Sequence, residues 1–558
     1  MSFFRYSVFP LSLSWTADAL WPLPSQFSIG NNQLVVTPGV DFFGISDQNL
    51  SDVQTLSDAL DRYKRLTFPH PWVEHQSSPD NESEKIEIRR VGRRLVGRGI
   101  SRNETSKDLA LTGMVISVRD QSEEILQLDT DESYSLLIYE SGGHGQILAE
   151  TVYGALRALE TFSQLVSFDF DSSTYRLDPN WGAPLFIKDF PRFRHRGLMI
   201  DSARHFLPVR TIKHAIDAMS YAKLNVLHWH LSDSQSFPMQ FHSRPKLWQG
   251  SFSSFERYLQ EEIIIIVEYA RERGIRVIPE FDVPGHAASW CTGYPEVCPS
   301  NPSCRQPLNV ARNDTFELIE DILSECVRSG SSGRSLFPDK FIHLGGDEVD
   351  INCWEKDLEI SAWLASRRFT LDDGYAYFVK SVADIAIKQG RRPIQWSEVY
   401  DHFKRDLDPS TIVHVWKSIT NVSEVAENGY DLIVNVGYTT GSWYLDNLDK
   451  AWDDIYMSDP CSTIAEDRPD LCAKVLGGHG EMWGETVDTS DFDATVWPRL
   501  GSIAERLWSP RASTENITDA LPRIVSFRCL LNERGIAAAP VGNANARMAP
   551  PEPGSCYN

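Results

Sequence analysis

The sequence predicts an α/β fold in which a (β/α)8 TIM barrel follows a small α+β domain. Eight short apolar runs alternate with longer segments of helical period, each run ends in polar or aromatic residues, and the preceding part of the chain has a different rhythm. Parallel strands buried on both faces appear as continuous apolar runs, and barrel enzymes carry their chemistry at the carboxyl ends of these strands. A chain of 558 residues is long enough for both domains.

Residues 1–19 have the features of a signal peptide, with one basic residue, an apolar stretch interrupted by Pro10, and an A-x-A triplet at 17–19. Nine cysteines and N-x-S/T sequons at Asn49, Asn81, Asn103, Asn313, Asn421 and Asn516 also favour the secretory pathway. We therefore expect a secreted or vacuolar/lysosomal protein. Since nine is odd, one thiol must lack an intramolecular partner, and the helical pattern around Cys326 favours that residue.

The composition argues against two classes of partner. The chain has 54 basic and 77 acidic residues, a formal charge of −23 and a pI near 5.1. This balance disfavours nucleic acid and anionic membranes. No apolar run approaches the roughly 20 residues that span a bilayer, and the run 263–267 is predicted to be the buried face of a helix.

Residues 20–190 are predicted to form the α+β domain, with β-like runs at 109–118 and 133–140 and a helix over 152–166. The polar tract 74–84 is expected to be an exposed loop. The barrel and a C-terminal extension are assigned to 191–558. Its predicted strands are 197–201, 225–230, 275–282, 341–348, 393–399, 411–417, 431–437 and 475–483.

Two adjacent acids, Asp347 and Glu348, follow Gly345 and Gly346 at the end of the fourth predicted strand. Neighbouring strand residues face opposite sides, so both acids can serve one site only where the strand ends. We expect the charge of Asp347 to raise the pKa of Glu348 and to keep it protonated as a general acid.

Two further groups of residues fall at predicted strand ends. His286 and Asp233 are candidates for a relay that orients the acid. Aromatic side chains and one arginine are predicted to form the walls of a sugar pocket, because aromatic faces pack on the C–H surfaces of pyranose rings. These candidates are Trp396, Trp416, Trp443, Tyr444, Trp483 and Arg204.

A metal site is the alternative that 228-HWH-230 raises, because His228 and His230 share one strand face. That site needs further ligands. The fifth and sixth strands end in tryptophan, and the sequence contains no H-E-x-x-H or C-x-x-C motif. We therefore predict no metal and no other cofactor.

Seven motifs of the barrel segment resemble the β-N-acetylhexosaminidases of glycoside hydrolase family 20. The matching stretches are 196-RGLMIDSARHF-206, 225-NVLHWHLSD-233, 276-RVIPEFDVPGH-286, 342-IHLGGDEV-349, 443-WYLD-446, 482-MWGE-485 and 504-AERLW-508. The resemblance implies a retaining mechanism in which the 2-acetamido group of the substrate is the nucleophile. Glu348 would then protonate the leaving oxygen, and Asp347 would hold the acetamide N–H.

The same resemblance implies roles for other residues. Tyr444 would bind the acetamide oxygen, and three tryptophans would enclose the sugar. Arg204, Asp446 and Glu485 would bind the hydroxyls of a terminal sugar, which implies exo action on amino-sugar glycans or chitin oligosaccharides. It pairs Cys529 with Cys556, Cys304 with Cys353 and Cys461 with Cys472, and it is compatible with a homodimer.

The sequence departs from the family pattern at two positions. Ser234 follows Asp233 where many relatives carry a second Asp, and Asn447 follows Asp446 where some carry an Arg that favours anionic substrates. The second departure favours neutral substrates. Two other functions remain as alternatives: a retaining β-glycosidase with a protein nucleophile, and a catalytically silent secreted carbohydrate-binding protein.

Overall fold

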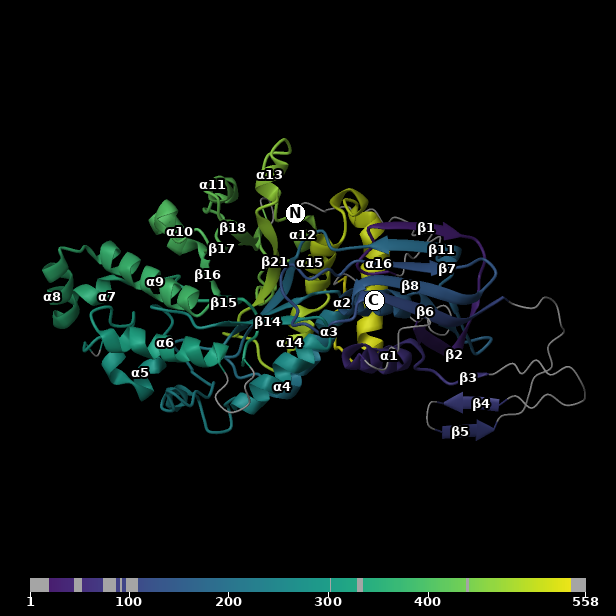
Figure 1. Ribbon diagram of the computed structural model, residues 1–558, viewed down its shortest axis with the longest axis horizontal. Coiled ribbons are helices and arrows are strands. Elements are labelled where there is room, and N and C mark those ends of the chain that lie inside the picture. The colour runs from purple at the N-terminus through teal and green to yellow at the C-terminus, as the bar shows by residue number, and fades with distance from the viewer. Residues whose placement is uncertain are drawn as a thin grey trace, which may run out of the picture.

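The computed structural model describes residues 20–44, 53–73, 87–90, 93–96, 109–301, 303–328, 335–437 and 441–542. A mixed β-sheet domain packs against one end of a closed barrel of eight parallel strands, as Figure 1 shows. The predicted signal peptide and the predicted loop at 74–84 lie outside the described residues. No helix in the described ranges is both long enough and apolar enough to cross a membrane.

The N-terminal domain is a sheet whose strand order is β1-β11-β7-β8-β6-β2-β10-β9. The predictions for 109–118, 133–140 and 152–166 are confirmed as β6, β7 and α2. Every residue of α2 is buried, because this helix lies between the sheet and the barrel (Figure 1). The elements are β1 Gln26–Gly30, β2 Val35–Gly44, α1 Gln54–Thr67, β6 Ala110–Asp120, β7 Tyr134–Ile138, β8 Gly143–Thr151, α2 Val152–Gln164, β9 Val166–Asp169, β10 Thr174–Leu177 and β11 Gly182–Asp189, with a small separate sheet of β3 Trp72–Val73, β4 Glu87–Arg90 and β5 Arg93–Val96.

All eight predicted barrel strands are confirmed, and the barrel closes where the first strand pairs with the last. The strands are β12 His195–Asp201, β13 Val226–His230, β14 Arg276–Glu280, β15 Phe341–His343, β16 Arg392–Trp396, β17 Ile412–Val415, β18 Asp431–Val434 and β21 Val475–Met482. The main helices around them are α3 Val209–Tyr221, α4 Gln260–Arg271, α6 Asn313–Val327, α9 Leu371–Lys388, α10 Ser397–Phe403, α11 Val422–Glu427 and α15 Arg499–Trp508, and α16 Ile517–Glu533 follows them. The apolar run 263–267 lies in α4, where Ile263 and Ile266 are buried as predicted and Ile265 is half exposed.

Shorter elements lie mainly in the connections between these strands and helices. They are η2 Leu247–Gly250, α5 Trp290–Gly293, η3 Pro295–Val297, α7 Asn352–Glu355, α8 Leu358–Arg367, η4 Lys404–Asp406, β19 Val436–Gly437, β20 Gly441–Ser442, α12 Trp452–Met457, α13 Pro469–Cys472, α14 Phe492–Val496 and η5 Arg511–Ser513.

The interior of the barrel changes from apolar to polar toward the carboxyl ends of the strands. An apolar layer comes first, formed by Val226, Ile278, Phe341, Ile394, Ile412, Ile433 and Leu476. Because alternate strand residues share a face, the residues two positions later form the next layer, among them His228, Glu280, His343 and His414. These four are at most 1% exposed. The polar layer therefore supports the strand ends from below.

Buried ion pairs join the two domains. Glu132 of the N-terminal domain accepts hydrogen bonds from Arg196 at 2.7 Å and from Asn225 at 3.0 Å, both at the start of barrel strands, and it pairs with Arg157 of α2 at 2.7 Å. Lys223 donates to Asp189 at 2.8 Å across the same interface. Burying these charges is costly unless each has its partner. Each domain therefore supplies the counter-charges for buried groups of the other.

Three disulfides are formed among the described residues. Cys304–Cys353 and Cys461–Cys472 confirm two predicted pairs, whereas Cys291–Cys298 was not predicted. Cys529 is disulfide-bonded, and its predicted partner, Cys556, lies outside the described residues. Cys326 is free and buried, as predicted. This usage of cysteine is typical of proteins that fold in an oxidising compartment.

Candidate active site

The turn that carries the two acids begins where β15 ends, at His343. Gly345, Gly346 and Glu348 have positive φ angles of 64°, 100° and 49°, so the regular alternation of the strand is broken there. A Cβ atom on Gly345 would lie 1.8 Å from Oδ1 of Asp282, which leaves room only for glycine. The turn buries Asp347 and leaves the side chain of Glu348 56% exposed. Both acids thus reach the carboxyl end of the barrel.

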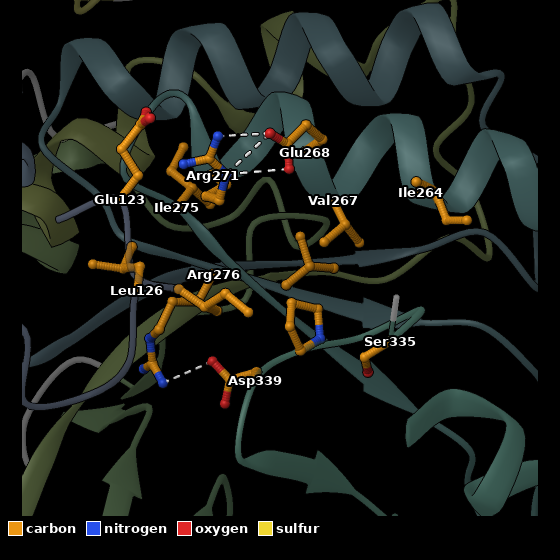
Figure 2. A pocket seen from close by; sticks show the side chains of 13 residues that line it. Glu123, Leu126, Ile264, Val267, Glu268, Arg271, Ile275, Arg276, Ser335 and Asp339 are labelled. Atoms are coloured by element: carbon orange, nitrogen blue, oxygen red, sulfur yellow. Dashed lines mark hydrogen bonds and ion pairs between the residues drawn. The ribbon is translucent and has the colours of Figure 1, made fainter. Parts of the chain in front are cut away.

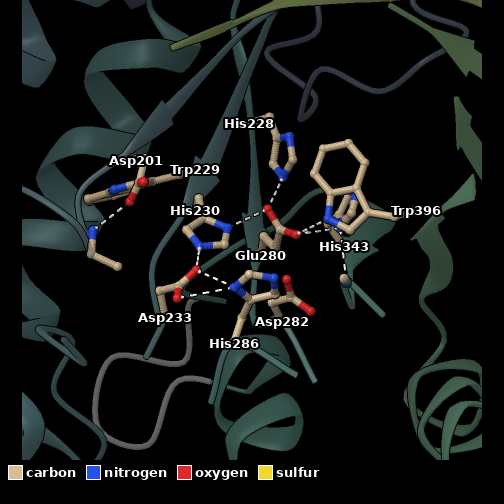
Figure 3. Close-up of polar contacts among 12 residues, drawn as sticks. Asp201, His228, Trp229, His230, Asp233, Glu280, Asp282, His286, His343 and Trp396 are labelled. Carbon is tan, nitrogen blue, oxygen red and sulfur yellow. Dashed lines mark hydrogen bonds and ion pairs between the residues drawn. The ribbon is translucent and has the colours of Figure 1, made fainter. Parts of the chain in front are cut away.

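The predicted relay is present as a set of close contacts, part of which is drawn in Figure 3. His286 Nδ1 lies 3.2 Å from Oδ2 of Asp233. His286 Nε2 lies 3.5 Å from Oε2 of Glu348 and 3.8 Å from Oδ2 of Asp347. The structure therefore brings together all four residues that the sequence assigned to acid–base chemistry.

The prediction that Asp347 raises the pKa of Glu348 is wrong, because this pKa is lowered. The hydrogen bond from His286 is the main influence on Glu348 and lowers its pKa, and this outweighs the opposing effect of partial burial. Burial alone would lower the pKa of His286, but the surrounding carboxyl groups more than offset this effect and raise it. Glu348 therefore lies beside the protonated ring of His286. The position of Asp347 next to Glu348 in the sequence did not indicate that His286 would dominate its pKa.

Arg204 lies in a cluster of acids beside the relay. Its guanidinium contacts Asp201 at 3.1 Å and Asp233 at 2.7 Å, and it lies 3.9 Å from Glu485. It also packs 4.9 Å from the ring centroid of Trp483. Arg204 and the exposed Glu485, which are both predicted to bind sugar, therefore lie close together.

The aromatic residues are close together, with one exception. Trp396 lies 6.5 Å from Trp416 and 6.0 Å from Trp483, measured between ring centroids, and Tyr444 lies 6.2 Å from Trp416. Trp443 is 1% exposed and packs in the main hydrophobic core. Its assignment to the wall of the pocket was therefore wrong, because the ring packs against Gly478 of β21.

Two of the carboxylates assigned to the site have a buried oxygen with no hydrogen-bond partner among the described residues. These oxygens are Oδ1 of Asp347 and Oδ1 of Asp446. Burial raises the pKa of Asp446 to about 6, with a further contribution from Glu485. Buried polar atoms are almost always paired, so oxygens in this state are suited to accept hydrogen bonds from a ligand.

Glu280 and Asp282 were not recognised as site residues from the sequence, although both lie in the predicted strand 275–282. Glu280 receives contacts from His228 at 2.9 Å, from His230 at 2.8 Å and from Nε1 of Trp396 at 2.9 Å (Figure 3). The sequence feature that could have identified them is the spacing of Ile278, Glu280 and Asp282, which puts two acids at alternate positions of an otherwise apolar run.

The same contacts involve His228 and His230, the pair that raised the alternative of a metal site. His228 and His230 do share a strand face, but both contact the same oxygen of Glu280. His343 and His414 contact each other through ring nitrogens 3.1 Å apart. These histidines are thus linked to neighbouring side chains by hydrogen bonds, and ring nitrogens of His228, His343 and His414 lie within 4.8 Å of one another.

A cavity of about 470 Å³ lies at the opposite end of the barrel, between residues 123–126, helix α4 and the start of β14. Figure 2 shows its mixed lining, in which Arg276 pairs with Asp339 and Arg271 with Glu268. Chemistry in this fold belongs to the carboxyl ends of the strands, so the cavity lies outside the candidate active site.

The closed barrel and paired acids at its carboxyl end define the class of a glycoside hydrolase. Comparison with known proteins agrees. Residues 193–511 match the family model described as glycosyl hydrolase family 20, catalytic domain, and residues 20–165 match the model described as beta-acetyl hexosaminidase like.

Full-length relatives support the same assignment. The chain is 43% identical to beta-hexosaminidase 1 of Arabidopsis thaliana, with 96% of this chain and 94% of the relative covered. It is 34% identical to the beta-hexosaminidase subunit alpha of Bos taurus, with 94% of each covered. The chain therefore belongs to glycosyl hydrolase family 20, and within it to the β-hexosaminidases.

Solved structures match the fold. The chitobiase of Flavobacterium johnsoniae superposes with a TM-score of 0.73 at 28% identity, over 93% of this chain and 73% of that one. An exo-β-N-acetylglucosaminidase of Vibrio harveyi in complex with N-acetylglucosamine superposes with a TM-score of 0.74 at 23% identity, over 97% and 81%.

Proposed function

We propose that this enzyme is an exo-acting β-N-acetylhexosaminidase that removes terminal β-linked N-acetylglucosamine or N-acetylgalactosamine by substrate assistance. The observation that carries the proposal is the pairing of a buried Asp347, one oxygen of which has no partner among the described residues, with the exposed Glu348 beside it. A buried carboxylate with a free oxygen suits an acetamide N–H, and an exposed carboxyl suits the glycosidic oxygen.

The mechanism follows from these positions. Glu348 donates a proton to the leaving oxygen while the acetamide oxygen of the substrate attacks the anomeric carbon, giving an oxazolinium ion and the free aglycone. Asp347 orients the acetamide and stabilises the positive charge that develops on it. Glu348 then takes a proton from water, which opens the ring with retention. His286 and Asp233 hold Glu348 in place throughout.

Glu348 must be protonated to act, although the hydrogen bond with His286 lowers its pKa. A bound sugar would cover this half-exposed carboxyl and displace water from it. Desolvation favours the neutral form of a carboxyl group, so the bound substrate itself would promote the protonated state.

The remaining residues are assigned to recognition. Tyr444 would bind the acetamide oxygen, and Trp396, Trp416 and Trp483 would pack against the sugar. Arg204, Asp446 and Glu485 would bind ring hydroxyls. Amino-sugar glycans or chitin oligosaccharides are the proposed substrates, and a secreted, vacuolar or lysosomal location is consistent with the disulfides.

Arg204→Lys is expected to raise KM by about 10- to 100-fold with a smaller effect on kcat, because an ammonium cannot reproduce the paired contacts of a guanidinium. Steady-state kinetics with a chromogenic β-N-acetylglucosaminide would measure this. Arg273→Lys, which alters a pair with Asp217 outside the site, is the matched control. An unchanged KM in the Arg204 variant would remove the arginine from the binding site.

Asp347→Asn tests the proposal itself. With chelator present, the wild type should hydrolyse a β-N-acetylglucosaminide rapidly and the matching β-glucoside hardly at all. The variant should lose about 100-fold or more in kcat on the first substrate, since the charge that stabilises the oxazolinium ion is gone.

Other outcomes would select one of the alternatives. Equal rates on both sugars would indicate a protein nucleophile, because such an enzyme does not need the acetamide. Binding of N-acetylglucosamine without hydrolysis of either glycoside would indicate a carbohydrate-binding protein.

A further inference from the structure

Asp282 is a buried acid that touches the catalytic turn from below. Its side chain is 1% exposed, and Oδ1 accepts a hydrogen bond from the backbone N–H of Gly346 at 2.8 Å. One oxygen of Asp282, one oxygen of Asp347 and one nitrogen of His286 lie within 4.8 Å of one another. Asp282 therefore holds the backbone of the turn and lies close to the side chain of Asp347.

Most of the titratable groups around Asp282 are acidic, so they disfavour a negative charge on Asp282 itself. Asp347 lies at the end of β15, Glu280 precedes Asp282 on its own strand, and the phenol of Tyr375 on α9 lies nearby and donates to the carbonyl of Gly346. His286 is the one cationic neighbour among the groups that dominate the electrostatics of Asp282, and it also contacts Asp233.

We propose that Asp282 is a positioning residue that acts as a neutral carboxylic acid, donating its proton in a hydrogen bond to Asp347 and so fixing the orientation of that carboxylate. The inference rests on the proposed function and goes beyond it. Asp282 would thereby hold Asp347 in the orientation in which it meets the acetamide N–H.

Electrostatics agree with the geometry. Burial raises the pKa of Asp282 well above its ordinary range, and the charge and hydrogen bond of Asp347 raise it further. Two carboxylates sharing a buried site cannot both ionise at ordinary pH. The neutral form of Asp282 therefore persists to higher pH than that of a free aspartic acid, and only above its raised pKa does Asp347 lose the donor.

Asparagine provides a sharp test, because its carbonyl can accept from Gly346 and its N–H can donate to Asp347 without ever ionising. The probe is N-acetylglucosamine itself, whose acetamide N–H is the group that Asp347 would hold and whose binding needs no proton from Glu348. Affinity would be measured by calorimetry across the pH range in which the enzyme stays folded, together with kcat and KM on a β-N-acetylglucosaminide.

Asp282→Asn should bind the probe within about threefold of the wild type near neutral pH and should retain that affinity at alkaline pH, where the wild type loses it. Asp282→Ala, which removes the donor, should bind about 10- to 100-fold more weakly at every pH. Asp339→Asn is the matched control: Asp339 is also a buried acid of raised pKa, but it pairs with Arg276 at the other end of the barrel. It should change neither affinity nor its pH dependence.

Two results would overturn the inference, and they are distinguishable. A wild type that neither hydrolyses the glycoside nor binds the probe would overturn the proposed function and the inference with it. An active wild type beside an Asn variant as weak as the Ala variant, or with an unchanged alkaline loss of affinity, would overturn the inference alone.

Discussion

Replacing Glu348 by glutamine is expected to reduce kcat on a β-N-acetylglucosaminide with an alkyl aglycone by about 100- to 10,000-fold, the range that general acid catalysis supplies. An amide cannot give a proton to the glycosidic oxygen. The loss should be smaller for a nitrophenyl aglycone, because that group leaves without full protonation. Rates on both substrates, compared at saturating concentration, would measure the difference.

The matched control is Glu355→Gln, the same substitution at an exposed position of α7 shortly after the catalytic turn. It should leave both rates unchanged. Near wild-type rates for Glu348→Gln on the alkyl glycoside would contradict the assignment of Glu348 and leave the acid to be sought elsewhere among the strand ends.

The largest effect on stability is expected from Glu132→Gln. This change leaves the buried guanidinium groups of Arg157 and Arg196 without their anionic partner, and loss of one partner of a buried ion pair costs about 3 to 5 kcal/mol. The free energy of unfolding, measured by urea titration at neutral pH, should fall by this amount. Glu150→Gln, which affects an exposed pair with Arg119, should hardly change it.

The contribution of Glu132 should also depend on pH with a definite sign. Burial opposes ionisation, but Arg196 and Arg157 more than offset it and hold the pKa of Glu132 below its ordinary value. A carboxyl group whose pKa is depressed by folding stabilises the native state fully above its unfolded pKa of about 4.3. The difference between wild type and variant should therefore persist at neutral pH and shrink as the pH falls through the folded pKa. A constant difference down to strongly acidic pH would contradict the assignment.

The barrel could be predicted from the sequence because its strands are short, mainly apolar runs that alternate with helical segments. The order of the strands in the N-terminal sheet could not, since β1 pairs with β11 across more than a hundred residues and no local pattern encodes such pairing. Cys291–Cys298 was missed for a related reason: which of nine cysteines pair depends on distances that only the fold sets.

The motifs named the four acid–base residues that the structure brings together, but they did not reveal the electrostatics of this group. The pKa of Glu348 is governed by His286, which lies 62 positions earlier in the chain and becomes a neighbour only when β14 and β15 pair. Asp282 and Glu280 escaped notice because acids within a buried strand resemble interruptions of an apolar run until the barrel closes around them.

The ion pairs between the domains also bear on how the protein can be dissected. The barrel contributes Arg196, Lys223 and Arg534, whose partners Glu132, Asp189 and Glu160 all belong to the N-terminal domain. A recombinant fragment cut at the domain boundary would carry three cations whose counter-charges had been left behind. The N-terminal domain is therefore expected to be needed for a stable catalytic domain.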